Sequence, residues 1–200
     1  KISPDMIVDA SDFDAVDAAF AAAISAMGSL DGVVNCAGSL LLKSAHLTTF
    51  EQYQSVIQAS LTTAFACVRA AGKHMTTGGS VVLISSAAAM EGLANHEAIA
   101  AAKAGVLGLT LSAAATYAPQ NLRVNAVAPG LTETPLTASI TGNEAARKFS
   151  LAMHALGRLG TPEDVARAII FLLDPANNWI TGQVLAVDGG LSRVRPKAKA

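Results

Sequence analysis

Charged and aromatic residues are scarce in this chain of 200 residues, at 14% and 4%, and its formal net charge is only −1. So small a charge provides no field that would attract nucleic acid or an anionic membrane, and we expect neither partner. Gly, Asn, Asp or Lys interrupts every apolar stretch before about 20 residues, which predicts no membrane-spanning segment. Residues 1–30 lack the basic and apolar segments of a signal peptide, so we expect a cytoplasmic protein.

Cysteine is also rare, and the two cysteines are far apart in the sequence. Cys36 and Cys67 have no histidine at metal-ligand spacing, and no such spacing occurs elsewhere in the chain. We therefore predict no metal site, and we expect both cysteines to be small buried residues.

What the chain has in abundance is small and apolar residues: 52% are hydrophobic and 16 are glycine. This composition is typical of a parallel sheet covered on both faces, whose strands are continuous apolar runs. The length fits one domain over residues 1–200. The runs predict strands over residues 6–9, 33–35, 80–84, 123–127 and 182–187.

Helical patterns lie between these strands. One begins at Ser11 and ends at Gly28, two more cover residues 49–75 and 96–118, and another begins with Thr161 as its N-cap. Residues 131–156 are expected to form a loop with a short helix, and residues 192–200 a flexible tail. Alternating strands and helices predict βαβ units, with ligands bound at the carboxyl ends of the strands.

Several segments, most of them at or near predicted strands, form a recognisable ordered set along the chain. Residues 35–38 read Asn-Cys-Ala-Gly, residues 84–86 read Ile-Ser-Ser, and residues 123–130 read Arg-Val-Asn-Ala-Val-Ala-Pro-Gly. With Arg-Leu-Gly-Thr-Pro-Glu-Asp-Val-Ala from residue 158 and Gly-Gln-Val-Leu-Ala-Val-Asp-Gly-Gly from residue 182, the chain resembles the short-chain dehydrogenase/reductase family almost throughout. The resemblance implies a Rossmann-like three-layer αβα fold with a mostly parallel sheet.

The resemblance also implies NAD(P)-dependent redox chemistry between carbonyl and alcohol groups, with catalytic positions at Ser86, Lys103, Ser60 and Ile99. Ser86 is placed to hydrogen-bond the substrate oxygen, and Lys103 to bind the nicotinamide ribose and lower the pKa of a tyrosine acid/base. That tyrosine belongs four residues before Lys103, where this chain has Ile99. An isoleucine has no ionisable group and cannot deliver a proton.

The resemblance also concerns the Ser60 position and the residues that would contact a cofactor. Ser60 replaces an asparagine that holds a relay water in the family, and a serine makes fewer hydrogen bonds. The resemblance implies NAD or NADP as the cofactor, although the absence of a Gly-rich pyrophosphate turn counts against tight binding. Its expected contacts are Asp9, Asn35, Ala37, Gly38, Lys103, Pro129, Gly130, Thr132 and Thr134.

The family's Gly-rich pyrophosphate turn has no counterpart in residues 1–32. We therefore expect an N-terminally truncated domain that lacks the first one or two of the usual seven strands, which leaves the strand around Val34 with a bare edge. Three arrangements would cover that edge: the strand at residues 6–9 beside it, a second chain, or a segment outside these 200 residues. We favour the first, because the intervening helix permits a right-handed crossover.

Three functions are compatible with these features. The first is a family member with impaired or absent catalysis. The second is an active oxidoreductase that acts on a small carbonyl or alcohol and uses a substitute donor, such as His96, or a missing N-terminal segment. The third is a non-enzymatic module that forms a homodimer or homotetramer through residues 49–75, 96–118 and the last strand.

Overall fold

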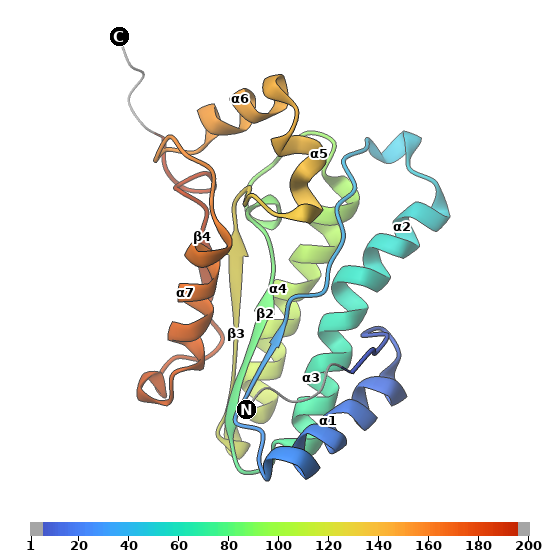
Figure 1. Cartoon of the computed structure of the whole chain (residues 1–200), viewed down its shortest axis with the longest axis vertical. Coiled ribbons are helices and arrows are strands. Elements are labelled where there is room, and N and C mark those ends of the chain that lie inside the picture. Colours follow the sequence, from blue (N-terminus) through green and yellow to red (C-terminus); the bar gives the residue numbers. More distant parts are fainter. Residues whose placement is uncertain (1–5, 196–200) are drawn as a thin grey trace.

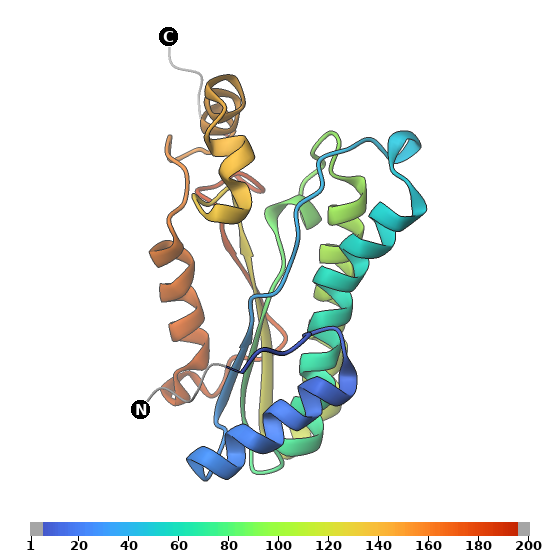
Figure 2. The same cartoon turned by 45° about the vertical axis from the view of Figure 1, so that its right-hand side comes forward.

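The computed structural model describes residues 6–195, which form a parallel four-stranded sheet between two helical layers (Figures 1 and 2). The strands follow one another across the sheet in chain order: β1 (Gly32–Asn35), β2 (Gly79–Ile84), β3 (Leu122–Pro129) and β4 (Val184–Val187). This arrangement confirms the predicted Rossmann-like α/β fold with a parallel sheet.

Two layers of helices cover the sheet. On one face α3 (Thr63–His74) and α4 (Glu97–Tyr117) pack on the strands, with α1 (Phe13–Met27) against α3 and α2 (Phe50–Ile57) against α4. On the other face lies α7 (Pro162–Leu173), which Figure 2 shows on the opposite side of the sheet from α1–α4. Short 3-10 turns are η1 (Ala45–Leu47), η3 (Ala87–Ala89), η4 (Ala118–Gln120) and η6 (Pro175–Asn177).

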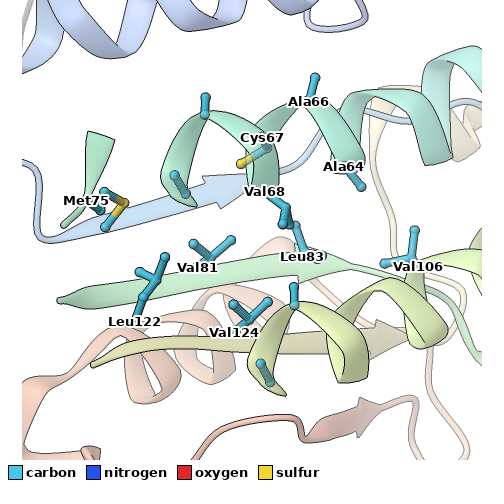
Figure 3. Packing of buried hydrophobic residues seen from close by; sticks show 14 of the residues in the cluster. Ala64, Ala66, Cys67, Val68, Met75, Val81, Leu83, Val106, Leu122 and Val124 are labelled. Carbon is cyan, nitrogen blue, oxygen red and sulfur yellow. The ribbon is translucent and has the colours of Figure 1, made fainter. Parts of the chain in front are cut away.

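The largest core cluster lies between the sheet and the α3–α4 layer (Figure 3). Because both faces of β2 and β3 are covered, these strands are apolar at successive positions, as their sequences predict. The cluster includes Val81 and Leu83 of β2, Leu122 and Val124 of β3, Val68 and Met75 from the α3 side, and Val106 of α4.

Two helix starts test the predicted caps. Thr161 caps α7 as predicted, in a reciprocal pair with Asp164. The predicted start of α1 at Ser11 is wrong by one residue, because the Oδ1 atom of Asp12 accepts from the backbone N–H groups of Asp14 (2.9 Å) and Ala15 (3.0 Å). The Ser11 hydroxyl donates instead to Asp9.

The helical stretch predicted over residues 49–75 is interrupted by a π-helical turn, η2 (Gln58–Thr62), between α2 and α3. A π turn accommodates one extra residue, which a regular 3.6-residue periodicity does not reveal. Ser60 lies inside this turn and is 1% exposed.

Residues 131–156 contain more helix than the predicted loop. The turn η5 (Pro135–Thr137) leads into α5 (Ala138–Thr141) and α6 (Glu144–Met153). In Figure 1 these helices lie beyond the arrowheads of the strands, at the edge where ligands bind in parallel sheets.

The strand predicted at residues 6–9 is wrong. These residues are not in a strand, and within residues 6–195 β1 pairs with β2 alone, so the favoured arrangement of the bare edge is also wrong. Met6 and Ile7 are exposed, while Val8 packs against the helical side of the core. The Asp9 carbonyl accepts from the Asp12 N–H at 3.1 Å, which turns the chain into α1 rather than along β1.

One helix does not fit the expectation that no apolar stretch is long enough to span a membrane, and that helix includes α4. Together with η4 it forms a helix over Glu97–Gln120 whose length and mean hydropathy of 1.6 would suit a membrane span. Its packing on β2, β3 and α2 is that of a core helix, and core helices of this kind have the same length and hydropathy.

Two smaller expectations also fail. Cys67 is buried, but Cys36 is exposed because it lies in the turn that leaves β1. The predicted flexible tail begins too early: Ser192 is buried and hydrogen-bonded to Asp188, and Arg195 pairs with Glu91 at 2.7 Å. The rest of that predicted tail, residues 196–200, lies outside the described residues.

Candidate functional site

A cavity of about 380 Å³ opens at the carboxyl ends of the strands, between α4 and the α5–α6 segment. Its volume is within the range of pockets that bind small molecules. Seven of the predicted site residues line it: Ala37, Gly38, Ser86, Ile99, Lys103, Pro129 and Gly130. The sheet therefore brings together most of the residues that the sequence singled out.

Ser86 is the second residue after β2 and is half-buried. Its hydroxyl oxygen accepts from the Ala88 N–H at 3.1 Å, which leaves the hydroxyl proton available to a ligand oxygen. The neighbouring Ser85 donates to the carbonyl of Lys103 at 2.9 Å and joins the end of β2 to α4. Ser86 is thus held at the cavity wall in a position to donate.

Lys103 is 6% exposed, and its Nζ donates to the Ile84 carbonyl at 2.8 Å. Burial lowers the pKa of Lys103 to about 8, and the nearby Cys36 thiol opposes that change only in part. Among residues 6–195, no carboxylate oxygen lies within 4.0 Å of this amine. The cavity therefore contains a buried amine without a counter-ion.

Ile99 lies one helical turn before Lys103 on α4 and is 4% exposed. It packs in a cluster with Val56 of α2 and with Ala98 and Ala102. The position therefore contributes an apolar surface to the cavity and has no proton to give.

Ser60 and Asn35 lie behind the cavity lining. The Ser60 hydroxyl oxygen accepts from the Ser39 N–H at 3.4 Å. The Asn35 amide donates to the Thr63 hydroxyl at 3.3 Å, and its oxygen accepts from the Ala37 N–H at 3.1 Å. Both side chains hold the turn after β1 in place.

Asp9 lies beside the cavity in a shallow hollow that also includes Ala37 and Gly38. Its carboxylate accepts two hydrogen bonds from Ser11, and these lower the pKa of Asp9. The hollow and the cavity share Ala37 and Gly38, so the hollow continues the cavity along the turn after β1.

Thr132 and Thr134 do not line the cavity. Thr132 is buried and donates to the Gly130 carbonyl at 3.2 Å, while Thr134 caps η5 together with Thr137. The hydroxyls of Thr132 and Thr134 therefore form hydrogen bonds within the segment that follows β3.

The turn at Gly38 shows whether a nicotinamide cofactor fits. A Cβ atom at Gly38 would lie 3.3 Å from Nζ of Lys103 and 3.9 Å from Oγ of Ser60. Because the glycine has no such atom, the space beside the amine stays open to a ribose, and the nicotinamide end fits. Residues 6–31 contain no glycine-rich turn that opens a helix, so the described residues that could hold the cofactor lie at its nicotinamide end.

His154 is a residue of the site that sequence reasoning did not identify. It is 3% exposed and lines the cavity just after α6. Its Nδ1 donates to the Ser150 carbonyl at 2.7 Å, and its Nε2 accepts from the Leu131 N–H at 3.2 Å. Both partners are backbone groups, which no pattern of side chains could have indicated.

The remaining walls of the cavity are largely apolar and come mainly from residues 88–96 and 131–155. They include Leu93, Leu136, Ile140, Phe149 and Met153. A ligand with a compact apolar body and one polar group at Ser86 suits such a lining. Within residues 6–195, no three His, Cys, Asp or Glu side chains are grouped to hold a metal ion.

Comparison with known proteins agrees with this geometry. A family model described as enoyl-(acyl carrier protein) reductase matches residues 3–192. Cis-4-hydroxycyclohexanecarboxylate dehydrogenase of Sinomonas cyclohexanicum is 42% identical over 189 residues, which cover 93% of this chain and 75% of that enzyme. The chain belongs to the short-chain dehydrogenase/reductase family.

Similar members of the short-chain dehydrogenase/reductase family differ in activity. The inactive 2-(S)-hydroxypropyl-CoM dehydrogenase 2 of Xanthobacter autotrophicus is 38% identical, over 93% of this chain and 84% of that protein. The solved structure of ElxO with NADP bound is 34% identical, with a TM-score of 0.86 over 92% of this chain and 76% of that one. The family therefore includes both active and inactive proteins close to this chain.

Proposed function

We propose that the cavity binds the nicotinamide end of NAD or NADP beside a small, mainly apolar carbonyl or alcohol compound, and that its catalysis of hydride transfer is impaired or absent. The observation that carries this proposal is Ile99, a buried apolar side chain in the cavity wall one turn from Lys103. A bound nicotinamide would supply or accept the hydride, but the proton that must accompany it has no donor at this position.

The other residues retain their proposed roles. The Ser86 hydroxyl orients the substrate oxygen, and the Lys103 amine hydrogen-bonds the ribose through the opening beside Gly38. The Asn35 amide keeps the turn at Ala37 close to the cofactor. The similarity to an NADP-bound structure supports the same ligand class here.

The decisive experiment adds the missing group. Ile99→Tyr places a phenol one turn before Lys103, so we expect turnover of a generic carbonyl substrate with NADPH or NADH to rise by about 100-fold or more, the usual contribution of a general acid. Turnover is followed by nicotinamide absorbance, and cofactor binding by a thermal-shift titration.

Ile99→Phe is the matched control, since it adds the ring without the hydroxyl. Equal turnover in the two variants would contradict the role assigned to the missing proton donor. Failure of Ile99→Tyr to raise turnover although the cofactor binds would contradict it as well. Absence of any thermal shift at millimolar cofactor would contradict dinucleotide binding itself.

A second candidate function is an active oxidoreductase in which His96 replaces the tyrosine. His96 lines the same cavity, and its Nδ1 donates to the Ala94 carbonyl at 2.8 Å, so its Nε2 is left to face a ligand. This function predicts measurable turnover in the unmodified chain and its loss in His96→Gln. Unchanged turnover in His96→Gln would exclude it.

Association into a homodimer or homotetramer also stays a proposal, as does a cytoplasmic location. Exposed apolar side chains on the outer helices support association, namely Phe50 and Tyr53 of α2, Phe65 of α3 and Leu111 of α4. Size-exclusion chromatography with light scattering tests it, and a strict monomer would contradict it.

A further inference from the structure

Lys103 has a buried amine with few hydrogen-bond partners. Within residues 6–195, the Ile84 carbonyl is the one hydrogen-bond acceptor of its amine, although an ammonium group has three protons to donate. The amine lies between Ile84 and Gly38, which both line the cavity. A molecule that enters the cavity therefore meets the amine directly.

The surroundings of this amine favour its neutral form. A buried ammonium without a carboxylate partner loses hydration and gains no ion pair in return. Burial accordingly lowers the pKa of Lys103 to about 8, and the titratable side chain that opposes this is the Cys36 thiol. Near neutral pH, Lys103 thus carries an unprotonated lone pair far more often than a surface lysine does.

The cavity also selects what can reach the amine. Its lining from α4, α5 and α6 is mostly apolar, with Ile99, Ile140 and Phe149 among the contributing side chains. The Ser86 hydroxyl lines the same cavity as the amine and can donate to a carbonyl oxygen. A desolvated lysine in an apolar pocket is the arrangement that activates an amine toward carbonyl compounds.

We propose that Lys103 captures small apolar aldehydes and ketones as an imine. The Nζ lone pair attacks the carbonyl carbon while the π electrons of the C=O bond move to oxygen. A proton moves from nitrogen to that oxygen to give a carbinolamine, which then loses water as the C=N bond forms. Amine and carbonyl become imine and water, and nothing is oxidised or reduced.

This capture does not require a dinucleotide. The proposed function assigns the same amine to the nicotinamide ribose, so a bound cofactor and an imine exclude each other. The two proposals can be separated, because imine formation is measured without cofactor and protection by NADPH is measured afterwards.

Reductive trapping tests the proposal. The protein is mixed with substoichiometric hexanal and sodium cyanoborohydride at neutral pH, and the alkylated lysines are located by peptide mass spectrometry. We expect Lys103 to be labelled at least tenfold faster than the exposed Lys73 and Lys148, because its amine lines the cavity and burial lowers its pKa to about 8. Labelling of Lys73 and Lys148 as fast as Lys103 would overturn the proposal, as would an unlabelled Lys103.

A matched variant separates chemistry from packing. Lys103→Arg keeps a cation at the position but cannot form an imine, so we expect the fast labelling to disappear while the slow labelling of surface lysines stays. The mapping in the unmodified chain decides the matter if that variant does not fold. Addition of NADPH should slow labelling of Lys103 alone, and failure of this protection would count against the proposed cofactor site and not against the imine.

Discussion

Two walls of the same cavity each contain a buried titratable side chain, and these two side chains differ in how many of their polar atoms have partners. On the α4 wall, the Lys103 amine has one backbone acceptor and no carboxylate within 4.0 Å among the residues described. On the α6 wall, both ring nitrogens of His154 are engaged by backbone groups. The α4 wall is thus left able to react, whereas the α6 wall is fixed.

The turn behind the α6 wall is also held by hydrogen bonds. His154 contacts the turn after β4, where the Asp188 carboxylate accepts from the N–H groups of Gly190 (2.8 Å) and Ser192 (2.9 Å). Hydrogen bonds from Ser192 and Gly190 lower the pKa of Asp188 despite its burial. The fixed group therefore lies on one wall of the cavity and the reactive group on the other.

The largest effect should come from removing the fixed group. His154→Ala leaves the Ser150 carbonyl and the Leu131 N–H without partners in the interior, at about 1–3 kcal/mol each. We expect the free energy of unfolding to fall by about 4 kcal/mol and the melting temperature by roughly 10 °C. Urea and thermal denaturation measure both quantities.

His46→Ala is the control for that variant, because His46 is exposed on η1 and should change stability by less than about 0.5 kcal/mol. Equal losses in the two variants would mean that the α6 wall is no more tightly held than the surface.

The next largest effect is the pH dependence of stability that Lys103 causes. Its pKa is about 8 in the folded chain and near 10.5 when unfolded, so between these values the unfolded chain binds a proton that the folded chain has released. Stability from this residue therefore rises as the pH rises from 8 to 10.5, by about 3 kcal/mol, and the penalty is fully present below pH 8.

Lys103→Met removes this titration. We expect the stability of Lys103→Met, relative to the unmodified chain, to decline across the same pH window in urea denaturation. A difference that does not change with pH would show that the amine is charged in the folded state, and the contrast between the walls would be lost.

The smallest effect compares one glycine on each wall. A Cβ at Gly130 would lie 2.7 Å from Nε2 of His154 and 2.9 Å from the Asp188 backbone, whereas at Gly38 the nearest atom is the flexible end of Lys103 at 3.3 Å. We expect Gly130→Ala to cost about 2 kcal/mol and Gly38→Ala less than about 0.5 kcal/mol. Neither glycine has a positive φ, so backbone strain does not confuse the comparison. Denaturation of both variants under the same conditions measures the difference, and equal costs would contradict it.

The sequence predicted most of the sheet because its signals are local. β2 and β3 are continuous apolar runs, and the predicted strand of residues 80–84 lies within Gly79–Ile84. The error at residues 6–9 has a different cause. An apolar run of that length forms a strand only where a neighbour offers hydrogen bonds, and here the Asp9 carbonyl bonds to Asp12 instead.

The site was predictable where it follows strand ends and obscure where it depends on backbone geometry. Ser86, Ile99 and Lys103 line one cavity because Ile99 and Lys103 share a face of α4 and Ser86 lies two residues after the end of β2. His154 was missed because its partners are a carbonyl and an amide of the main chain. Thr132 and Thr134 were expected at the cofactor but turn their hydroxyls to the loop itself.

The π turn at Gln58–Thr62 has a consequence for how the wall around Ile99 is built. Each residue of an α-helix advances the direction of the next side chain by about 100°, so one additional residue re-aims everything that precedes it. The buried side chains of α3 pack toward the sheet, while Val56 of α2 packs against Ile99 on α4. The extra residue in the turn allows both helices to face their partners. Deletion of a single residue from this turn would rotate α2 away from Ile99 and leave the cavity without its outer support.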